Sequence, residues 1–492
     1  MTMTTKFNLA AHVLSQADHL ADKIALDVVG SNEAPLTFSD LKTAVLGTAT
    51  GLRDLGLSPG DRVLLRLGNT PDFPLAYLGA LAAGFVPAPT SAALTEPEVS
   101  NIIKELNPAV ILRASNVACP QDKRIVQSDA LQSMRTCTPS DWHMGDPDRP
   151  GYIIYTSGTS GVARAVVHAH RAILARQMMF DGWYGLRQQD RVLHAGAFNW
   201  TYTLGTGLMD PWTIGATALI PAPNTPAPDL LNLVAEHKAT IFAAAPGVYR
   251  QALRGPIPAL PNLRHGLSAG EKLPEVTRQS WQDATHTPVF EAFGMSEIST
   301  FISGNPTEPA LPGTLGRPQP GRRVTLISDT KPADTTTTGV IAVHKSDPGL
   351  FLEYLDQPEE TGRRFDGDWF MTGDVGQADE DGNITYLGRS DDMMNAGGFR
   401  VSPIEVERVL NEFDGITGSI VVELPIKSAA SIIAAFYTSA SPVDEHALND
   451  YLHINLARYK CPRQLTRIET LPTGANGKLL RRQLRDTWKG PN

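Results

Sequence analysis

The segment Tyr155-Thr156-Ser157-Gly158-Thr159-Ser160-Gly161-Val162-Ala163-Arg164-Ala165 carries the strongest structural signal in the chain. It follows the apolar run Tyr152-Ile153-Ile154, which predicts a strand. Five hydroxyl side chains and two glycines fill its first seven residues. Such a segment cannot form a core, but its backbone N–H groups and hydroxyls can wrap polyphosphate oxygens. A flexible Ser/Thr/Gly linker is the alternative interpretation. The chain contains no GxxxxGKS or GxxxxGKT sequence, which excludes a Walker A loop.

The sequence on both sides of this loop alternates between helix-like and strand-like patterns. Residues 38–55 predict a helix with Ser39 as its N-cap, and residues 62–66 predict a short apolar strand. Further elements are expected as a helix at 71–84 and strands near 109–112, 192–195, 216–220 and 240–244. Strands and helices joined by short connections are typical of an α/β fold, with mostly parallel sheets flanked by helices.

The length of the chain predicts more than one domain, because single cores stop growing at roughly 250–300 residues and this chain has 492. We expect residues 1–387 to form a large N-terminal α/β body of several subdomains. Residues 388–392, Gly388-Arg389-Ser390-Asp391-Asp392, read as a polar joint. Residues 393–492 predict a small α+β domain, with a helix at 403–413, strands near 419–422 and 432–437, and a helix from Asp444.

The bulk composition excludes several classes of protein. A formal net charge of −9 argues against a nucleic-acid binder. The cysteines Cys119, Cys137 and Cys461 form no CxxC pair, which argues against a disulfide framework or a zinc site. No run approaches the roughly 18 apolar residues of a membrane span, and the N-terminus lacks the apolar core of a signal peptide. We therefore expect a cytoplasmic protein without nucleic-acid or membrane partners. The sequence leaves open whether the protein forms a homodimer.

The segment at 155–165 resembles the phosphate loop of the adenylate-forming superfamily, which includes acyl- and aryl-CoA synthetases. That loop usually reads YTSGTTGxPKG. This chain keeps the first half and departs in the second, with Ala163 for Pro, Arg164 for Lys and Ala165 for Gly. Arginine keeps the positive charge but offers a broader, planar set of donors.

Six further segments resemble the superfamily's motifs and occur in the same order. They are Ser268-Ala269-Gly270-Glu271, Phe293-Gly294-Met295-Ser296-Glu297, Thr372-Gly373-Asp374, Gly388-Arg389-Ser390-Asp391-Asp392, the loop from Met394 to Glu405, and Pro472-Thr473-Gly474-Ala475-Asn476-Gly477-Lys478. Any one of these could be an ordinary turn or surface segment, since charged residues are mostly exposed. Seven matches in the correct order predict an adenylate-forming enzyme.

The resemblance implies a role for each matching residue. The ATP-binding residues it implies are Thr156, Ser157, Gly158, Thr159, Ser160, Gly161, Ala269, Gly270, Glu271, Phe293, Gly294, Ser296, Asp374 and Arg389. Catalytic roles are implied for Arg164 on the β- and γ-phosphates, Glu297 as the Mg²⁺ ligand, and Lys478 between the substrate carboxylate and the α-phosphate. Gly397 and Gly398 are expected to line the CoA channel. The resemblance also implies a hinge at 388–392, with Asp391 as the hinge residue, about which a mobile C-terminal domain (393–492) moves between two half-reactions.

The resemblance also places an acyl pocket, and its expected lining is Phe198, Trp200, Tyr202, Ala245, Gly247 and Met295. Core packing is the alternative for each aromatic residue. No Lys, Arg or His stands in the expected floor segments, so a second substrate carboxylate is not favoured. The predicted function is ATP- and Mg²⁺-dependent ligation of a benzoate-like or short- to medium-chain monocarboxylate to coenzyme A. Two alternatives are a stand-alone enzyme that loads a carrier-protein thiol and a catalytically weak nucleotide-binding regulator.

Overall fold

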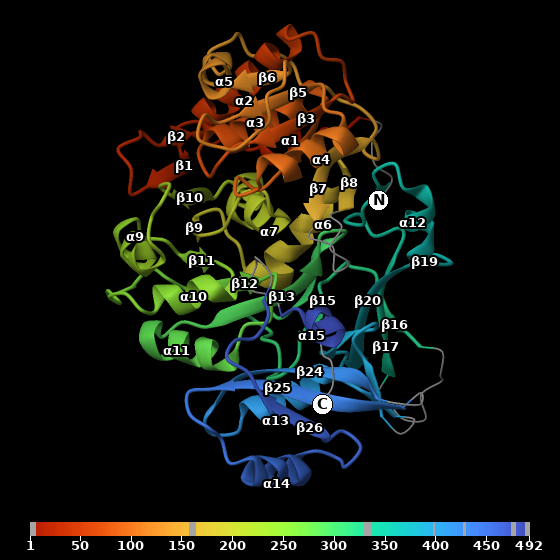
Figure 1. Cartoon of the computed structure of the whole chain (residues 1–492). Coiled ribbons are helices and arrows are strands. Elements are labelled where there is room, and N and C mark those ends of the chain that lie inside the picture. The colour runs from red at the N-terminus through yellow and green to blue at the C-terminus, as the bar shows by residue number, and fades with distance from the viewer. Residues whose placement is uncertain are drawn as a thin grey trace. The chain divides into compact units, whose positions relative to one another are not determined.

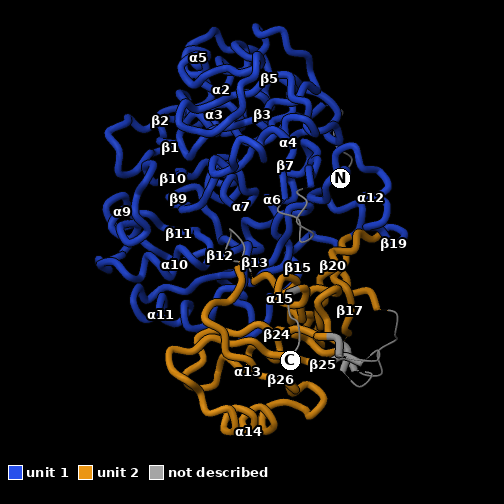
Figure 2. Tube along the Cα trace, viewed as in Figure 1, with its two compact units in different colours: residues 1–323, 344–368 blue, residues 324–343, 369–492 orange. Residues whose placement is uncertain are grey.

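The computed structural model describes residues 6–156, 164–328, 337–396, 399–426, 430–473 and 479–487. The chain divides into two compact units (Figure 2). Unit 1 comprises residues 1–323 and 344–368, and unit 2 comprises residues 324–343 and 369–492. The predicted α/β class is confirmed. The boundary of unit 2 differs from the predicted one at 388–392, because the strands on either side of the turn at 379–383 pair with each other. The hinge itself stays a prediction.

The largest sheet of unit 1 has nine strands within the described residues, in the order β15-β14-β13-β12-β11-β9-β10-β1-β2. The strands are β1 Ile24–Val29, β2 Leu36–Thr37, β9 Arg191–His194, β10 Thr217–Pro221, β11 Ile241–Ala243, β12 His265–Ala269, β13 Val289–Met295, β14 Ser299–Ser303 and β15 Arg317–Pro318. Neighbours from β1 to β13 are parallel, whereas β2, β14 and β15 pair antiparallel with their neighbours, and β2 and β15 form the two edges. Three of the central strands, β9, β10 and β11, confirm the strands expected near 192–195, 216–220 and 240–244.

A second, all-parallel sheet is formed by residues 62–127, in the order β4-β3-β5-β6, at the top of the view in Figure 1. Its elements are α2 Phe38–Asp54, β3 Arg62–Arg66, α3 Asp72–Ala83, β4 Val86–Pro89, α4 Glu96–Leu106, β5 Val110–Arg113, β6 Ile125–Gln127 and α5 Ser128–Met134. The N-cap of α2 is Thr37 and not the predicted Ser39. Thr37 Oγ1 accepts from Asp40 N, and Asp40 Oδ2 accepts from Thr37 N, a reciprocal capping box that Ser39 cannot make. Helix α3 is buried on every side because it is apolar all round.

The remaining elements of unit 1 connect these sheets. An antiparallel sheet of β7 Pro150–Thr156, β8 Arg164–Ala169 and β18 Glu353–Tyr354 contains the expected strand before the phosphate loop. The others are α1 Leu9–Val13, α6 Ala172–Met179, the π-helix η1 Phe180–Tyr184, α7 Thr201–Leu204, the π-helix η2 Gly205–Met209, α8 Asp210–Ile214, the 3₁₀-helix η3 Ala227–Asp229, α9 Leu230–Glu236, α10 Pro246–Ala252, α11 Glu275–Thr285, α12 Pro358–Arg363 and β19 Phe365–Asp366.

Unit 2 is built from hairpins and three helices within the described residues. Strand β16 Val324–Ile327 pairs with β17 Thr337–His344, and β20 Trp369–Ala378 pairs with β21 Ile384–Arg389. Gly382, at φ +80°, supplies the turn of the β20–β21 hairpin. The other elements are β22 Met394–Ala396, β23 Phe399–Val401, α13 Pro403–Asn411, β24 Ile416–Ile426, β25 Ala430–Ser439, α14 Glu445–Asn455, β26 Gln464–Arg467 and α15 Arg481–Thr487. Across the described residues, helices fall short of the length and apolarity that crossing a membrane requires.

A buried ion pair lies inside unit 1, where an apolar core would be expected. Arg176 donates from Nε and Nη2 to the two carboxylate oxygens of Asp210, at 2.9 and 2.6 Å. Tyr184 donates to the same carboxylate at 2.7 Å, and Arg176 Nη1 donates to Ser299 Oγ at 2.6 Å. Burial by itself lowers the pKa of Arg176, but Asp210, Tyr184 and Tyr152 together raise it above its ordinary value, so the guanidinium keeps its charge.

We expect Asp210→Asn to lower the free energy of unfolding by about 3 kcal/mol, because it leaves the Arg176 charge buried without a counter-ion. The measurement is the urea or thermal denaturation midpoint of the full chain. Asp18→Asn is the matched control, since Asp18 pairs with Lys42 at the surface and exposed pairs contribute little. Equal midpoints for the two variants would contradict the assignment.

Candidate active site

The β7–β8 hairpin holds the two ends of the predicted phosphate loop. Thr156 and Arg164 are paired across the hairpin, so the loop between them is anchored on both sides. The predicted phosphate-binding residues Ser157, Gly158, Thr159, Ser160 and Gly161 lie outside the described residues. Arg164 Nη2 lies 2.8 Å from Glu360 Oε1, and its guanidinium carbon lies 5.2 Å from the centre of the Tyr354 ring. The cation predicted to contact phosphate therefore has a carboxylate partner and an aromatic neighbour.

The predicted metal ligand Glu297 lies in the tight turn between β13 and β14. Tyr354 donates its hydroxyl hydrogen to Glu297 Oε1 at 2.8 Å. Ser299 closes the turn at φ +71°. Gly294 has no room for a side chain, because an added Cβ would lie 2.3 Å from Ser299 O. The geometry of this turn therefore requires glycine at the position where the motif has it.

His168, on β8, fixes the same turn from the other side. Its Nε2 lies 2.8 Å from Ser296 O, and its ring stacks on Tyr152 at 4.7 Å. Burial lowers the pKa of His168 to about 4. The ring is therefore neutral near pH 7, and Nε2–H donates to the carbonyl. Ser296 is half-buried, whereas Glu297 is 7% exposed.

The surroundings of Glu297 fit a hard cation that is held mainly by a substrate. Its Oε2 accepts no hydrogen bond from the residues that the structure describes. Among those residues, no group of three or more His, Cys, Asp or Glu side chains could hold a metal by itself. Mg²⁺ typically binds one or two carboxylates and completes its coordination with phosphate oxygens and water. A single carboxylate beside a phosphate loop is compatible with that mode of binding.

The predicted adenine-side residues lie at the carboxyl ends of β12 and β13. Ala269 pairs with Ala292 across the two strands, which brings Gly270 level with Phe293. Gly270 is exposed at φ +92°, and an added Cβ would meet no atom within 4 Å. Ser268 Oγ is buried without a partner among the described atoms. Ligands of parallel α/β sheets bind outside the carboxyl ends of the strands, so this edge is where a nucleotide is expected.

One predicted acyl wall follows β9 at the same edge of the sheet. Asn69 fixes this segment: Nδ2 donates to Gly196 O at 2.6 Å and Oδ1 accepts from Phe198 N at 3.1 Å. Phe198 is buried against the ring of Phe73, as the core-packing alternative describes. The hydroxyl of Tyr202, another buried residue, donates to Leu267 O at 2.8 Å. Trp200, the N-cap of α7, is half-buried.

The second predicted wall follows β11, the neighbour of β9. Ala245 and Gly247 are half-buried at the start of α10, and a Cβ added to Gly247 would meet nothing within 4 Å. Met295, at the end of β13, is also half-buried. The strands β9, β11, β12 and β13 are consecutive in the sheet. The structure therefore brings all of the predicted acyl-pocket residues to one sheet edge, where the acyl role stays a prediction.

In unit 2, the predicted ribose contacts meet in the β20–β21 hairpin. Asp374 pairs directly with Arg389, and Arg389 Nη1 lies 3.2 Å from Asp374 Oδ2. Tyr386 donates to Asp374 Oδ1 at 2.9 Å. Burial and the Asp374 carboxylate raise the pKa of Tyr386 well above its ordinary value, so the phenol keeps its proton. Arg389 Nε also lies 3.5 Å from the exposed Asp391, the predicted hinge residue.

The adenylation lysine Lys478 and the CoA-channel residues Gly397 and Gly398 lie outside the described residues. The flanks of the Lys478 segment are well anchored. An antiparallel bridge joins Thr473 to Leu479. The following helix α15 is tied to the rest of unit 2 by two ion pairs, Arg481 with Glu407 and Arg485 with Asp392.

Comparison with known proteins identifies the family. A family model described as AMP-binding enzyme matches residues 13–355. The chain belongs to the AMP-binding enzyme family. A 3-hydroxybenzoate–CoA/4-hydroxybenzoate–CoA ligase of Thauera aromatica is 30% identical, with 92% of each chain covered. A benzoate–CoA ligase of the same organism is 30% identical, with 91% of this chain and 90% of its own covered. The solved structure of the anthranilate CoA ligase AuaEII with anthranoyl-AMP has a TM-score of 0.86 at 25% identity and covers 98% of both chains.

These relatives confirm the predicted superfamily and enzyme class: this AMP-binding enzyme is an AMP-forming acid–thiol ligase. Sequence motifs alone did not point to Tyr354, Glu360, His168 or Asn69. Tyr354 and Glu360 follow the Glu297 motif by more than fifty residues, and the pairing of β18 with β8 brings them to the site. An aromatic residue and a carboxylate in such a segment give no signal in the sequence.

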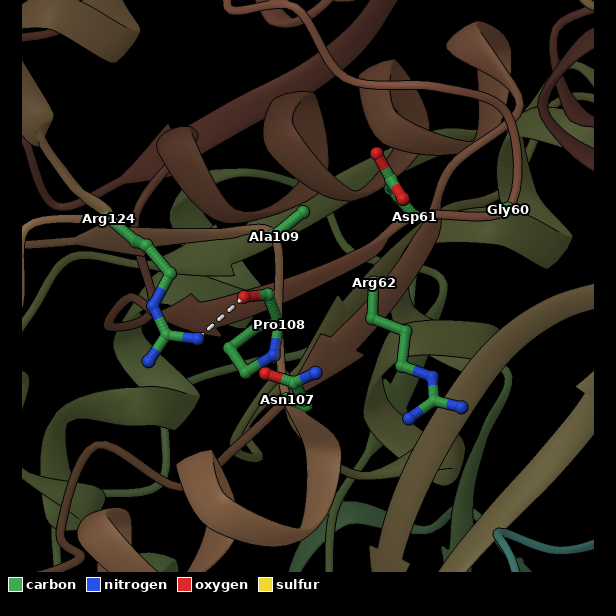
Figure 3. Close-up of a pocket in the computed structure, with 7 residues that line it drawn as sticks. All are labelled: Gly60, Asp61, Arg62, Asn107, Pro108, Ala109 and Arg124. Atoms are coloured by element: carbon green, nitrogen blue, oxygen red, sulfur yellow. Dashed lines mark hydrogen bonds between the residues drawn. The ribbon is translucent and has the colours of Figure 1, made fainter.

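A hollow of about 460 Å³ occurs elsewhere in this AMP-binding enzyme and contains none of the predicted site residues (Figure 3). It lies at the amino ends of β3 and β5, lined in part by Asp61, Arg62, Asn107 and Arg124. Arg62 lies 3.7 Å from Asp356, and Arg124 pairs with Asp122 and donates to Pro108 O. Both guanidinium groups are therefore partnered, and the hollow presents little free charge to a ligand.

We expect Gly373→Ala to weaken ATP binding about tenfold. An added Cβ would lie 2.7 Å from Arg389 Nη2 and displace the guanidinium whose Nη1 pairs with Asp374, and a lost charge-assisted hydrogen bond is worth about 1.5–3 kcal/mol. Gly382→Ala is the matched control in the same hairpin, since Gly382 has a similar positive φ but no atom within 4 Å of an added Cβ. Calorimetric titration with ATP should separate the two, and equal losses would indicate backbone strain alone.

Proposed function

We propose that this AMP-binding enzyme joins an aromatic, benzoate-like monocarboxylic acid to coenzyme A. ATP is converted to AMP and diphosphate, and an acyl-adenylate is the intermediate. The same proposal includes a cytoplasmic location, Mg²⁺ dependence, and small molecules as the only substrates. The aromatic acid follows from the relatives that act on benzoate and hydroxybenzoates.

The observation that supports the proposal most is the composition of the sheet edge where the nucleotide motifs end. The segments after β9 and β11, residues 195–204 and 244–248, contain no Lys, Arg, Asp or Glu. They lie beside Ala269–Gly270 and the Glu297 turn on consecutive strands. The polar atoms of Tyr202 and Asn69 are satisfied by backbone groups, so they leave apolar surface for a ring. An uncharged wall beside a phosphate site suits a monocarboxylate whose only charge is at the reacting end.

In the first half-reaction, a carboxylate oxygen attacks the α-phosphorus of ATP and diphosphate leaves. Negative charge moves onto the leaving phosphates, so positioned cations provide most of the catalysis. We assign Arg164 to the β- and γ-phosphates, Asp374 and Arg389 to the ribose hydroxyls, and Lys478 to the carboxylate and α-phosphate. Mg²⁺ held by Glu297 would neutralise phosphate charge.

In the second half-reaction, the CoA thiolate attacks the acyl carbon and AMP leaves with the bonding electron pair on its phosphate oxygen. A lysine bound at the α-phosphate obstructs the approach of the thiol. We therefore assign Asp391 as the hinge that withdraws Lys478, and Gly397 and Gly398 to the thiol channel. Movement about a few hinge residues is a known way to run two reactions at one site.

We expect a panel of benzoates and short- to medium-chain aliphatic acids to show CoA-dependent AMP formation with the benzoates, because both predicted acyl walls are uncharged and the first contains aromatic residues. The measurement is AMP release with and without CoA. Turnover confined to aliphatic acids would show that the substrate is an aliphatic acid and not an aromatic one. Diphosphate release that CoA does not accelerate would indicate that the acyl acceptor is a carrier-protein thiol. The absence of AMP and diphosphate release with every acid would favour a nucleotide-binding regulator.

We expect Lys478→Ala to reduce adenylation by about 100-fold or more, since removing one positioned donor from a developing charge typically costs that much. Thiolation of a supplied acyl-adenylate should remain near the unsubstituted rate. Diphosphate exchange measures the first half-reaction and acyl-CoA formation measures the second. Lys460→Ala is the control, because Lys460 is a partly exposed lysine of unit 2 that pairs with Glu405. An equal loss in both half-reactions would refute the assigned role.

A further inference from the structure

Tyr354 connects two parts of the predicted polyphosphate site without belonging to any of its motifs. It is fully buried on β18 and pairs with Val166 of β8, two residues beyond Arg164. Its backbone N–H donates to Thr361 Oγ1 at 3.0 Å, and this bond fixes the strand to helix α12. The backbone of Tyr354 is therefore fixed by β8 on one side and by α12 on the other, and this fixes the position of the ring.

The hydroxyl of Tyr354 donates a hydrogen bond to the Glu297 carboxylate, with Oη 2.8 Å from Oε1. Glu297 is also held through its main chain, since Phe351 N donates to Glu297 O at 2.8 Å. In the bond between the two side chains, the phenol hydroxyl donates and the carboxylate oxygen accepts. The hydrogen bond fixes one carboxylate oxygen and leaves Oε2 for another ligand.

The ring of Tyr354 contacts the side chain of Arg164. The guanidinium carbon lies 5.2 Å from the ring centre, within the range of a cation–π contact. Glu360, on α12, holds the other side of the guanidinium at 2.8 Å. Arg164 thus lies between an aromatic face and a carboxylate, in a more defined position than a flexible lysine side chain would adopt.

From this geometry we propose that Tyr354 is a positioning residue for the polyphosphate site: its hydroxyl orients Glu297 toward Mg²⁺, and its ring supports Arg164 beside the phosphates. The inference rests on the proposed function for the roles of Glu297 and Arg164. It adds a residue outside the motifs, and it couples the metal ligand to the phosphate-binding arginine through one side chain.

The test is calorimetric titration of the full chain with ATP over a series of Mg²⁺ concentrations, without acid or CoA. Tyr354→Phe keeps the ring and removes the hydroxyl. We expect it to need about tenfold more Mg²⁺ for half-maximal tightening of ATP binding, the loss expected for one hydrogen bond to a charged group. ATP affinity in EDTA should stay unchanged. Mn²⁺, which binds oxygen and nitrogen ligands more tightly than Mg²⁺, should restore tight binding at lower concentration.

The matched control is Tyr386→Phe, which removes a hydroxyl from the predicted ribose carboxylate Asp374. It should weaken ATP binding by the same factor with and without Mg²⁺. If Tyr354→Phe shows the unsubstituted Mg²⁺ dependence, or weakens ATP binding equally in EDTA, the positioning role is overturned. Because the titration needs no acid, failure of the proposed function would appear separately, as absent AMP formation by a protein that still binds Mg²⁺ and ATP.

A second readout does not depend on the fold tolerating phenylalanine. Metal binding to Glu297 withdraws charge from the carboxylate that accepts the Tyr354 hydroxyl. Addition of Mg²⁺ to the ATP complex of the unsubstituted protein should therefore perturb its tyrosine ultraviolet difference spectrum. Glu297→Gln, which retains an oxygen acceptor for Tyr354, should abolish that change. A spectrum that Mg²⁺ does not alter in the unsubstituted protein would contradict the proposal.

Discussion

The parallel pairing of β9, β11, β12 and β13 is the constraint on which the site in unit 1 depends. Parallel strands carry their carboxyl ends at one edge, and the register here aligns His194 with Ala243 and Ala269 with Ala292. The segments that leave those strands must then begin side by side. Residues separated by a hundred positions in the sequence are brought to one edge by backbone hydrogen bonds alone, before any side chain contributes.

Within that frame, the turn after β13 is stabilised by polar side chains from three directions. His168 donates to Ser296 O, Tyr354 donates to Glu297, and Arg176 donates to Ser299 Oγ. A turn with a non-glycine residue at positive φ is strained, and Ser299 is such a residue. Three donors on this short turn offset that strain and restrict the carboxylate to one orientation. The ion pair of Arg176 with Asp210 then keeps a charged donor buried beneath the turn.

Much of the fold and part of the site could be predicted from the sequence, and the division has a physical reason. Glycines and hydroxyl residues at fixed spacing reflect local backbone requirements, such as the absence of room at Gly294 and Gly373, so motifs 269–271, 293–297 and 372–374 could be found. Strands near 192–195 and 240–244 follow from local hydrophobicity. Tyr354, Glu360 and the Arg176–Asp210 pair act through contacts between distant segments, which no local pattern encodes. Thr37 and not Ser39 is the N-cap of α2 because Thr37 stands three positions before Asp40. The carboxylate of Asp40 can accept a hydrogen bond from Thr37 N in return.

The replacement of the usual loop lysine by Arg164 is consistent with these distant contacts. A lysine ammonium is a compact, strongly hydrated charge on a flexible stem, whereas a guanidinium is planar and weakly hydrated. Only the planar group can lie over the Tyr354 ring and at the same time direct an N–H edge toward Glu360. Its remaining N–H groups are then oriented by two fixed neighbours. The departure from the motif at Arg164 is therefore compensated by contacts of its side chain with β18 and α12, outside the loop.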